Sequence, residues 1–130
     1  MSNRKFITKG KGLPEWSNPI SHAVVANNMC FVSGQLSVNG SGDYVPGTIT
    51  EETKRAFNNV FAALNAAGFD KSEVVYVDIA FADISQVEAV NTIYMELFEE
   101  GRRPARTIYE AAKLPFGGKI KVVATAVKGD

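Results

Sequence analysis

The sequence is poor in the residues that build metal sites and disulfides. Its 130 residues include one cysteine, Cys30, and one histidine, His22. A single cysteine cannot form an internal disulfide, and one histidine with one cysteine cannot supply the ligands of a tetrahedral zinc site. The glycine-rich patterns of phosphate-binding and dinucleotide-binding loops are also missing. We therefore expect no metal and no nucleotide cofactor.

Long apolar runs and an excess of one charge are absent as well. No stretch approaches the roughly 18 consecutive apolar residues of a membrane-spanning helix. No apolar segment follows the basic residues 1–5, so we expect no signal peptide and no membrane partner, and we predict a cytoplasmic protein. Lys plus Arg and Asp plus Glu both total 14, so no net charge attracts the chain to nucleic acid.

The composition is that of a folded protein. Apolar residues make up 45% and charged residues 22%, and 130 residues is about the size of one ordinary domain. No linker or repeat divides the sequence, so we predict a single domain over residues 1–130. Cys30 lies in an apolar stretch without a nearby base, which favours a small buried side chain over a nucleophile.

Residues 50–67 repeat apolar side chains every three or four positions, which is the period of a helix with one buried face. Thr48 with Glu51 predicts a capping box at its start, with Thr50 as the alternative cap. Gly68 is a natural end for this helix.

Residues 85–100 repeat apolar side chains at the same spacing and predict a second helix. Ser85 and Glu88 have the spacing of a capping box at its start. Gly101 follows the last apolar position and is expected to end the helix.

Five runs rich in β-branched and aromatic residues predict strands. They cover residues 23–27, 29–36, 73–82, 106–113 and 119–128. Asn27 and Asn28 tolerate the positive φ of a tight hairpin turn, and the Pro and Gly residues of 114–118 separate the last two strands. The order β-β-α-β-α-β-β predicts an α+β fold, a mixed β-sheet with two helices packed on one face.

The predicted strands 73–82 and 119–128 carry apolar side chains on much of both faces. A strand that is apolar on both faces is usually buried on both, but two helices can cover only one face of the sheet. We therefore predict that further copies of the chain cover the other face in a closed homo-oligomer.

Arg106 is the best candidate for binding chemistry. It follows Pro104 and opens the predicted strand 106–113, so its guanidinium lies at the entrance of a strand. There it could bind a carboxylate through two parallel hydrogen bonds, helped by peptide N–H groups of the strand. An ordinary surface arginine at a strand end is the alternative, and the spacing alone does not decide between them.

Several segments resemble the RidA/YjgF family in their order and approximate spacing. They are residues 19–23 (PISHA), 32–35 (VSGQ), 91–94 (NTIY) with 97–98 (LF), 104–107 (PART) and 113–115 (KLP). The similarity runs over about residues 19–127, and the Pro-x-Arg-Ser/Thr element is its most specific part. The resemblance favours the functional interpretation of Arg106.

The resemblance implies a chorismate-mutase-like α+β fold and a homotrimer with sites in the clefts between subunits. Active members hydrolyse reactive enamines and imines, such as 2-aminoacrylate, to 2-keto acids and ammonia without a cofactor. In that scheme Arg106 binds the substrate carboxylate, helped by backbone N–H groups near Ile108. Ser33, Gly34 and Asn91 are expected around the pocket.

Three positions depart from the family pattern. Val123 stands where active members carry a glutamate that positions or activates water, Ile108 where many have a cysteine, and Ile20 where a tyrosine covers the ligand. A valine side chain can neither transfer a proton nor hold a water. Lys121 and Thr125 share its strand face, but Thr125 could only orient a water and Lys121 could accept a proton only when neutral.

The sequence leaves two functions open. One is a cofactor-free deaminase of small imines and enamines derived from amino acids, with Arg106 holding the substrate carboxylate. The other is a homotrimeric protein that binds a small carboxylate without turnover, which the apolar residues Ile20, Ile108 and Val123 suggest. The ribonuclease activity also described for the family is disfavoured by the zero net charge and the single histidine. Trp16 could cover an apolar ligand or simply pack.

Overall fold

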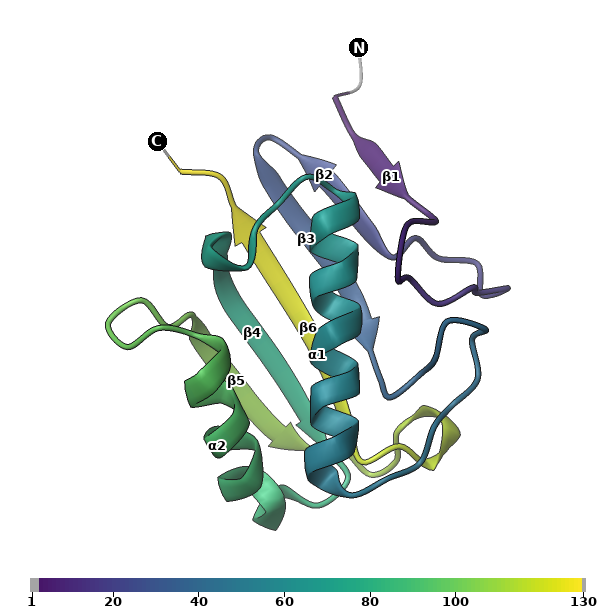
Figure 1. The fold of residues 1–130 in the computed structure, drawn as a ribbon, viewed down its shortest axis with the longest axis vertical. Coiled ribbons are helices and arrows are strands. Elements are labelled where there is room, and N and C mark those ends of the chain that lie inside the picture. Colours follow the sequence, from purple (N-terminus) through teal and green to yellow (C-terminus); the bar gives the residue numbers. More distant parts are fainter. Residues whose placement is uncertain (1–2, 130) are drawn as a thin grey trace.

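The computed structural model describes residues 3–129 as one mixed sheet with two helices against it (Figure 1). Met1, Ser2 and Asp130 lie outside the described residues, although the predicted domain 1–130 and the basic segment 1–5 include them. The strands are β1 (Lys5–Ile7), β2 (Ala23–Ala26), β3 (Met29–Gln35), β4 (Val74–Phe81), β5 (Ala105–Glu110) and β6 (Ile120–Val127). The helices are α1 (Ile49–Ala66) and α2 (Val87–Leu97), and short 3-10 turns occupy η1 (Lys71–Glu73), η2 (Ile84–Gln86) and η3 (Pro115–Gly117).

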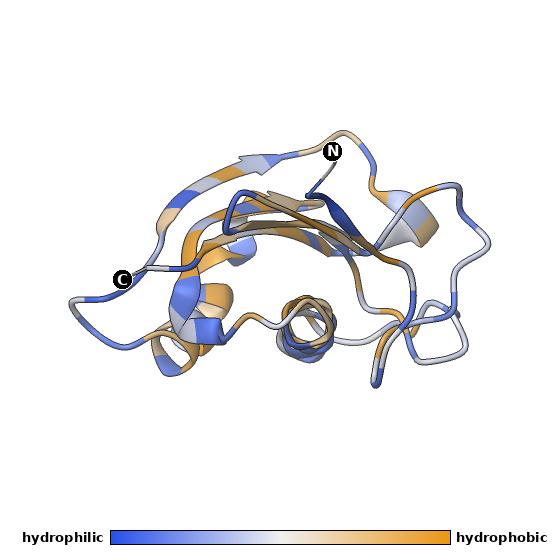
Figure 2. Ribbon diagram, turned by 90° about the horizontal axis from the view of Figure 1, so that it is seen from above, coloured by the Kyte–Doolittle hydropathy of each residue, from blue (hydrophilic) through white to orange (hydrophobic). Residues whose placement is uncertain are grey.

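The strands lie in the order β1-β2-β3-β6-β4-β5, and both helices pack on the same side of the sheet (Figure 2). The predicted α+β class, with a mixed sheet and two helices on one face, is therefore confirmed. The predicted element order was incomplete because it lacked β1. This strand has only three residues, too few for a periodic signal, and it forms by pairing with β2.

The sheet positions β6 at its centre, antiparallel to both β3 and β4. β2 and β3 form the predicted hairpin, with Asn27 and Asn28 at φ values of 50° and 65°. β4 and β5 are parallel, and α2 lies in the connection between them, as a parallel pair requires. β5 is therefore an edge strand that ends at Glu110, three residues before the predicted end.

α1 begins with the predicted capping box. The Thr48 hydroxyl accepts a hydrogen bond from the Glu51 N–H at 3.1 Å, and the Glu51 carboxylate accepts from the Thr48 N–H at 2.8 Å. Thr48 and not Thr50 is thus the cap, and Gly68 follows the helix with φ +85°. α1 buries an apolar stripe that includes Phe57 against the sheet.

The predicted capping box of Ser85 and Glu88 was wrong. The Asp83 carboxylate instead accepts hydrogen bonds from the Ser85 N–H and hydroxyl, at 3.0 and 2.7 Å, and so caps the turn η2. α2 then starts at Val87 without a side-chain cap and ends at Leu97, which makes it shorter than the predicted 85–100. A local carboxylate two residues upstream therefore outcompeted the expected cap.

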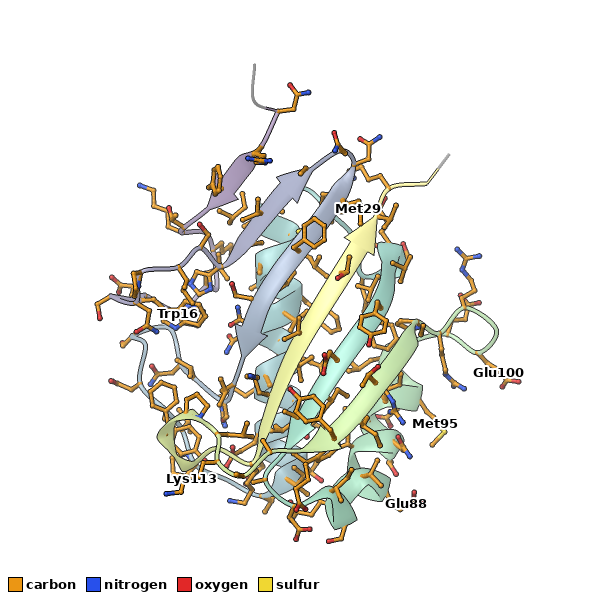
Figure 3. All side chains as sticks on the ribbon, turned by 180° about the vertical axis from the view of Figure 1, so that it is seen from behind. Trp16, Met29, Glu88, Met95, Glu100 and Lys113 are labelled. Carbon is orange, nitrogen blue, oxygen red and sulfur yellow. The ribbon has the colours of Figure 1, made fainter. Side chains whose placement is uncertain are left out.

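The face of the sheet that carries no helix exposes large apolar side chains, as Figure 3 shows from that side. Phe31, Tyr76 and Tyr109 project from this face of β3, β4 and β5 and are 46%, 36% and 42% exposed. We call this surface the open face. The predicted lack of a helical cover is confirmed, whereas the predicted cover by further copies stays a prediction.

Two smaller expectations concern burial and membranes. Cys30 is fully buried in the core, and burial raises the pKa of its thiol to about 11, which confirms its interpretation as a structural residue. Within residues 3–129, no helix is long and apolar enough to cross a membrane.

Candidate functional site

Arg106 lies on the helix side of the edge strand β5, paired in register with Val77 of β4. Its guanidinium donates a hydrogen bond to the Asn91 side-chain oxygen on α2 at 2.8 Å and lies 4.8 Å from the centre of the Tyr94 ring. These residues and Glu88 line an open pocket of about 420 Å³, which we call the arginine pocket. Two side chains of α2 thus fix the orientation of the guanidinium while leaving it accessible.

The backbone of β5 presents further donors at the free edge of the sheet, beside this pocket. Ala111 donates its N–H to Phe81 of β4 at 2.8 Å. Because N–H groups alternate sides along a strand, those of Arg106 and Ile108 point away from β4, toward the free edge of the sheet. The Ile108 side chain packs against the core, so this residue offers only its backbone to a ligand at the edge.

Tyr94 also lines the arginine pocket, although the sequence did not single it out as a site residue. Its hydroxyl is buried and has no hydrogen-bond partner among the described residues. Burial raises the pKa of Tyr94, and the positive charges of Arg106 and Arg103 oppose this change. The hydroxyl therefore stays protonated at neutral pH and is available as a donor.

A second pocket, of about 230 Å³, lies beside the end of β3 and the start of β6. Trp16, Ile20, Gly34, Phe116 and Lys121 are among the residues that line it, and we call it the lysine pocket. It brings together the predicted site residues Ile20 and Gly34.

Trp16 forms one wall of the lysine pocket. Its ring stacks on the buried His22 ring, with 3.9 Å between the ring centres. His22 is held in turn by a 2.8 Å hydrogen bond to the Pro14 carbonyl. The tryptophan therefore packs on the core and also faces the pocket, and its predicted role as the cover of an apolar ligand stays a prediction.

Three of the predicted site residues, Ser33, Ile108 and Val123, line neither pocket. The Ser33 hydroxyl donates to the Ser21 carbonyl at 2.6 Å, which ties the bulge of β3 to the segment before β2. Val123 lies on the open face opposite Asp78. The nearest residue of β6 that reaches a pocket is Lys121.

The two pockets lie far apart within one chain. Arg106 is in register with Val77, Ala124 and Val32 on the three successive strands β4, β6 and β3. Three strand spacings amount to ~14 Å, and Gly34 lies further along β3. Figure 3 shows the same separation, with Trp16 and the α2 residue Met95 near opposite lateral edges of the sheet. One chain therefore does not bring the predicted site residues together.

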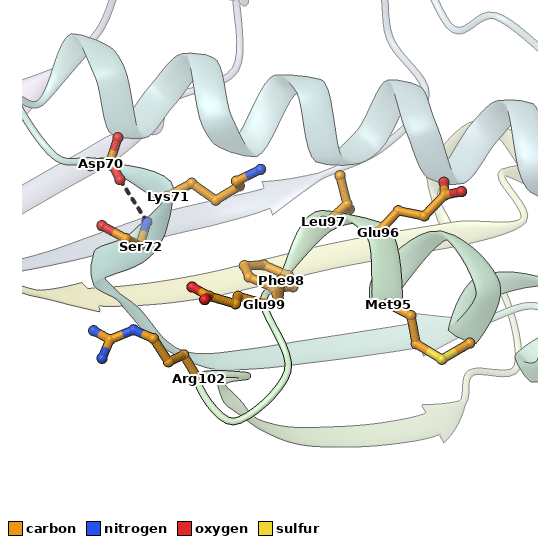
Figure 4. A pocket seen from close by; sticks show the side chains of 9 residues that line it. All are labelled: Asp70, Lys71, Ser72, Met95, Glu96, Leu97, Phe98, Glu99 and Arg102. Carbon is orange, nitrogen blue, oxygen red and sulfur yellow. Dashed lines mark hydrogen bonds between the residues drawn. The ribbon is translucent and has the colours of Figure 1, made fainter.

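A third pocket, of about 310 Å³, lies between η1 and the end of α2 (Figure 4). Exposed charged side chains such as Lys71, Glu99 and Arg102 surround it, and it contains none of the predicted site residues. Within residues 3–129, no group of three or more His, Cys, Asp or Glu side chains could hold a metal ion.

Known proteins resemble this chain over almost its whole length. Residues 12–128 match the family described as Endoribonuclease L-PSP. A goat (Capra hircus) protein named 2-iminobutanoate/2-iminopropanoate deaminase is 39% identical over 127 residues, which cover 97% of this chain and 91% of the goat protein. The human protein of the same name is 37% identical with the same coverage.

Solved structures agree with this match. A crystal structure from Thermotoga maritima superimposes with a TM-score of 0.90 at 37% identity, covering 97% of this chain and 99% of the other. The YjgF gene product of E. coli superimposes with a TM-score of 0.87 at 30% identity, covering 96% and 99% of the two chains.

Proposed function

Since this chain belongs to the endoribonuclease L-PSP family, also called RidA/YjgF, we propose that it is a cofactor-free deaminase. Its substrates are small enamines and imines derived from amino acids, of the 2-aminoacrylate type, and its products are 2-keto acids and ammonia. The relatives named 2-iminobutanoate/2-iminopropanoate deaminase support this proposal.

The setting of Arg106 is the observation that carries the proposal. The guanidinium is already oriented by Asn91 and Tyr94 and is accessible in the arginine pocket. The outward N–H of Ile108 lies two residues further along the same strand edge. A carboxylate that bridges these donors is held in one orientation, with the adjacent imine carbon at a fixed place.

The reaction needs little more than this orientation. Water adds to the imine carbon, the carbinolamine loses ammonia, and the carbonyl oxygen of the 2-keto acid comes from that water. No electrons are transferred, so no redox partner is required. Imines hydrolyse unaided, and a positioned substrate with a positioned water accelerates the step.

Glu88 is the one carboxylate among the residues that line either the arginine or the lysine pocket. It lies on α2 three residues before Asn91, so both side chains share one face of the helix. We assign to Glu88 the role of accepting the proton of the attacking water, and to the Tyr94 hydroxyl a donor role in the same pocket.

The complete site requires more than one chain in this proposal. The arginine and lysine pockets are separated across the width of the sheet within one chain. The open face between them exposes Phe31, Tyr76 and Tyr109. A homotrimer that buries these side chains would set the lysine pocket of one subunit against Arg106 of the next. Such an arrangement unites Ile20 and Gly34 with Arg106 and Asn91 in one cleft.

The experiment measures the loss of a freshly generated imine. An amino acid oxidase produces 2-iminobutanoate in the presence of semicarbazide, and the protein competes with semicarbazone formation. We expect a faster loss of imine with the protein than in buffer, and a loss of at least about tenfold in kcat/KM for Arg106→Ala. Arg102→Ala, which changes an exposed arginine outside both pockets, is the matched control. A rate equal to that of buffer would overturn the proposal.

A non-catalytic carboxylate-binding protein is the second candidate. It is favoured by the lysine pocket, whose lining includes apolar residues such as Ile20 and Phe116 and no carboxylate. In that case 2-oxobutyrate raises the melting temperature of the wild type and not of Arg106→Ala, while the imine assay shows no turnover.

A further inference from the structure

Lys121 has an unusual position for a surface lysine. It is half-buried on β6, and it is part of the lysine pocket. A Cβ atom added at Gly34 would lie 2.9 Å from its Cδ and 3.2 Å from its Cγ. The missing side chain at Gly34 thus gives room for the lysine stem, which leans from β6 across the bulge of β3.

The charge of Lys121 has no protein partner among residues 3–129. The two ion pairs of the described residues use Lys119 and Lys128, and Lys121 makes neither an ion pair nor a side-chain hydrogen bond there. Asp78 is the carboxylate of the neighbouring strand β4 on the same face. The lysine stem leans toward β3, which is the opposite direction.

The walls around this charge are largely apolar. Trp16, Ile20 and Phe116 line the pocket, and the Phe116 ring stacks on Tyr44 with 5.9 Å between the ring centres. An uncompensated charge beside apolar walls is costly, and an anionic ligand removes that cost. Low polarity also strengthens an ion pair once it has formed.

We propose that Lys121 binds a second anionic group of the substrate, so that the preferred substrates are 2-imino dicarboxylates derived from acidic amino acids. This inference rests on the proposed function, in which Arg106 of a neighbouring subunit holds the carboxylate next to the imine. Lys121 then holds the distal carboxylate, with the carbon chain between them along the apolar wall. Water replaces the imine nitrogen, which leaves as ammonia, and the distal carboxylate is unchanged.

Binding of stable product analogues tests the inference without turnover. Titration calorimetry compares 2-oxoglutarate with 2-oxobutyrate, and we expect the dicarboxylate to bind at least about tenfold more tightly to the wild type. Lys121→Met keeps the length of the stem and removes the charge, so this preference should disappear. Lys121→Arg should retain it, and Lys54→Met, at an exposed position on α1, is the matched control.

Turnover provides the second measurement. Amino acid oxidases generate the imines of aspartate, glutamate and 2-aminobutyrate, and we compare the ratio of kcat/KM for dicarboxylates to that for the monocarboxylate. Lys121→Met should lower this ratio at least about tenfold, and Lys121→Arg should restore it. Melting curves confirm that the variants are folded.

The outcomes separate this inference from the proposed function. Turnover of the monocarboxylic imine that depends on Arg106, with no dicarboxylate preference and no effect of Lys121→Met, overturns the inference alone. Lys121-dependent binding of 2-oxoglutarate without turnover of any imine supports the dicarboxylate site and overturns the deaminase. Equal binding of the two keto acids, together with equal turnover of the dicarboxylic and monocarboxylic imines, overturns the inference.

Discussion

At the scale of single residues, Glu52 holds the loops beside the lysine pocket. Its carboxylate is fully buried at the start of α1. It accepts hydrogen bonds from the Tyr44 hydroxyl at 2.6 Å, the Gly47 N–H at 3.2 Å and the Lys119 N–H at 3.1 Å. One side chain thus joins α1 to the loop before it and to the segment that leads into β6.

Replacement of this carboxylate is expected to be costly. Glu52→Ala should lower the free energy of unfolding by about 3 kcal/mol, because three donors lose their acceptor. Urea denaturation measures the change, and Glu96→Ala, at an exposed position on α2, should stay within about 0.5 kcal/mol of the wild type.

A second measurement reports on the same contact. Burial and the hydrogen bond to Glu52 raise the pKa of Tyr44 to about 12. Absorbance titration of the Tyr44 phenol in Glu52→Ala should give a pKa closer to the usual value of about 10. A variant as stable as Glu96→Ala, with an unchanged Tyr44 pKa, would contradict the assigned role.

The sequence identified Arg106, and the family resemblance placed Asn91 near it, but neither predicted the contact between the two side chains. The Pro-x-Arg-Thr element marked the residue, whereas Asn91 contacts it only because the parallel register of β4 and β5 brings α2 over that end of β5. The sequence suggested Lys121 only as a proton acceptor. Its place in a pocket depends on the bulge at Gly34, and a bulge leaves no periodic signal in the sequence.

At the scale of elements, periodicity predicted both helices and five of the six strands. The predicted helix cap at Thr48 and the predicted hairpin turn at Asn27 and Asn28 are both present, because caps and tight turns depend on neighbouring residues alone. β1 was missed because its formation depends on pairing with β2, a distant partner. Rules that depend on neighbouring residues therefore predicted the helices and most strands. The pairing of strands that are distant in the sequence could not be predicted in this way.

Gly42 connects two loops that form the neighbourhood of Trp16. It has φ +87°, and an added Cβ atom would lie 2.2 Å from the Glu15 carbonyl oxygen. At Gly40, two residues earlier, an added Cβ atom would meet nothing within 4 Å, and the Gly40 carbonyl accepts a hydrogen bond from the Glu15 N–H at 3.0 Å. An alanine substitution at Gly40 is therefore a matched control for the same substitution at Gly42.

Gly42→Ala should lower the free energy of unfolding by about 1–2 kcal/mol and displace the Trp16 loop, because both the backbone angle and the contact with Glu15 oppose a side chain. Trp16 is the one tryptophan, so its fluorescence reports the displacement directly. Gly40→Ala should leave stability and fluorescence unchanged. Equal behaviour of the two variants would show that this contact does not hold the loop.

At the scale of the whole molecule, His22 makes stability depend on pH. It is 1% exposed, its Nε2 donates to the Pro14 carbonyl at 2.8 Å, and its Nδ1 faces the Gln35 side-chain nitrogen at 3.3 Å. Burial lowers the pKa of His22, and the bond to Pro14 opposes this change. The folded protein thus favours the neutral ring.

The sign of the effect follows from that preference. The contribution of His22 is fully present above about pH 6.5, where the ring is neutral in both states. This contribution is lost as the pH falls from about 6.5 toward the pKa of His22 in the folded protein, because the unfolded chain takes up the proton first. The free energy of unfolding then falls by up to about 1.4 kcal/mol per pH unit. Urea denaturation at pH 7.5 and 5.0 measures the loss, and His22→Gln should show a smaller one. An equal loss in both proteins would exclude His22 as its source.

The central position of β6 has a consequence for synthesis. Residues 120–127 pair with β3 on one side and β4 on the other, yet they form the last strand that the ribosome synthesises. Until then the nascent chain carries two unpaired strand edges where the middle of the sheet will form. Chains that stop before residue 120 should therefore bind chaperones or aggregate and accumulate no folded domain.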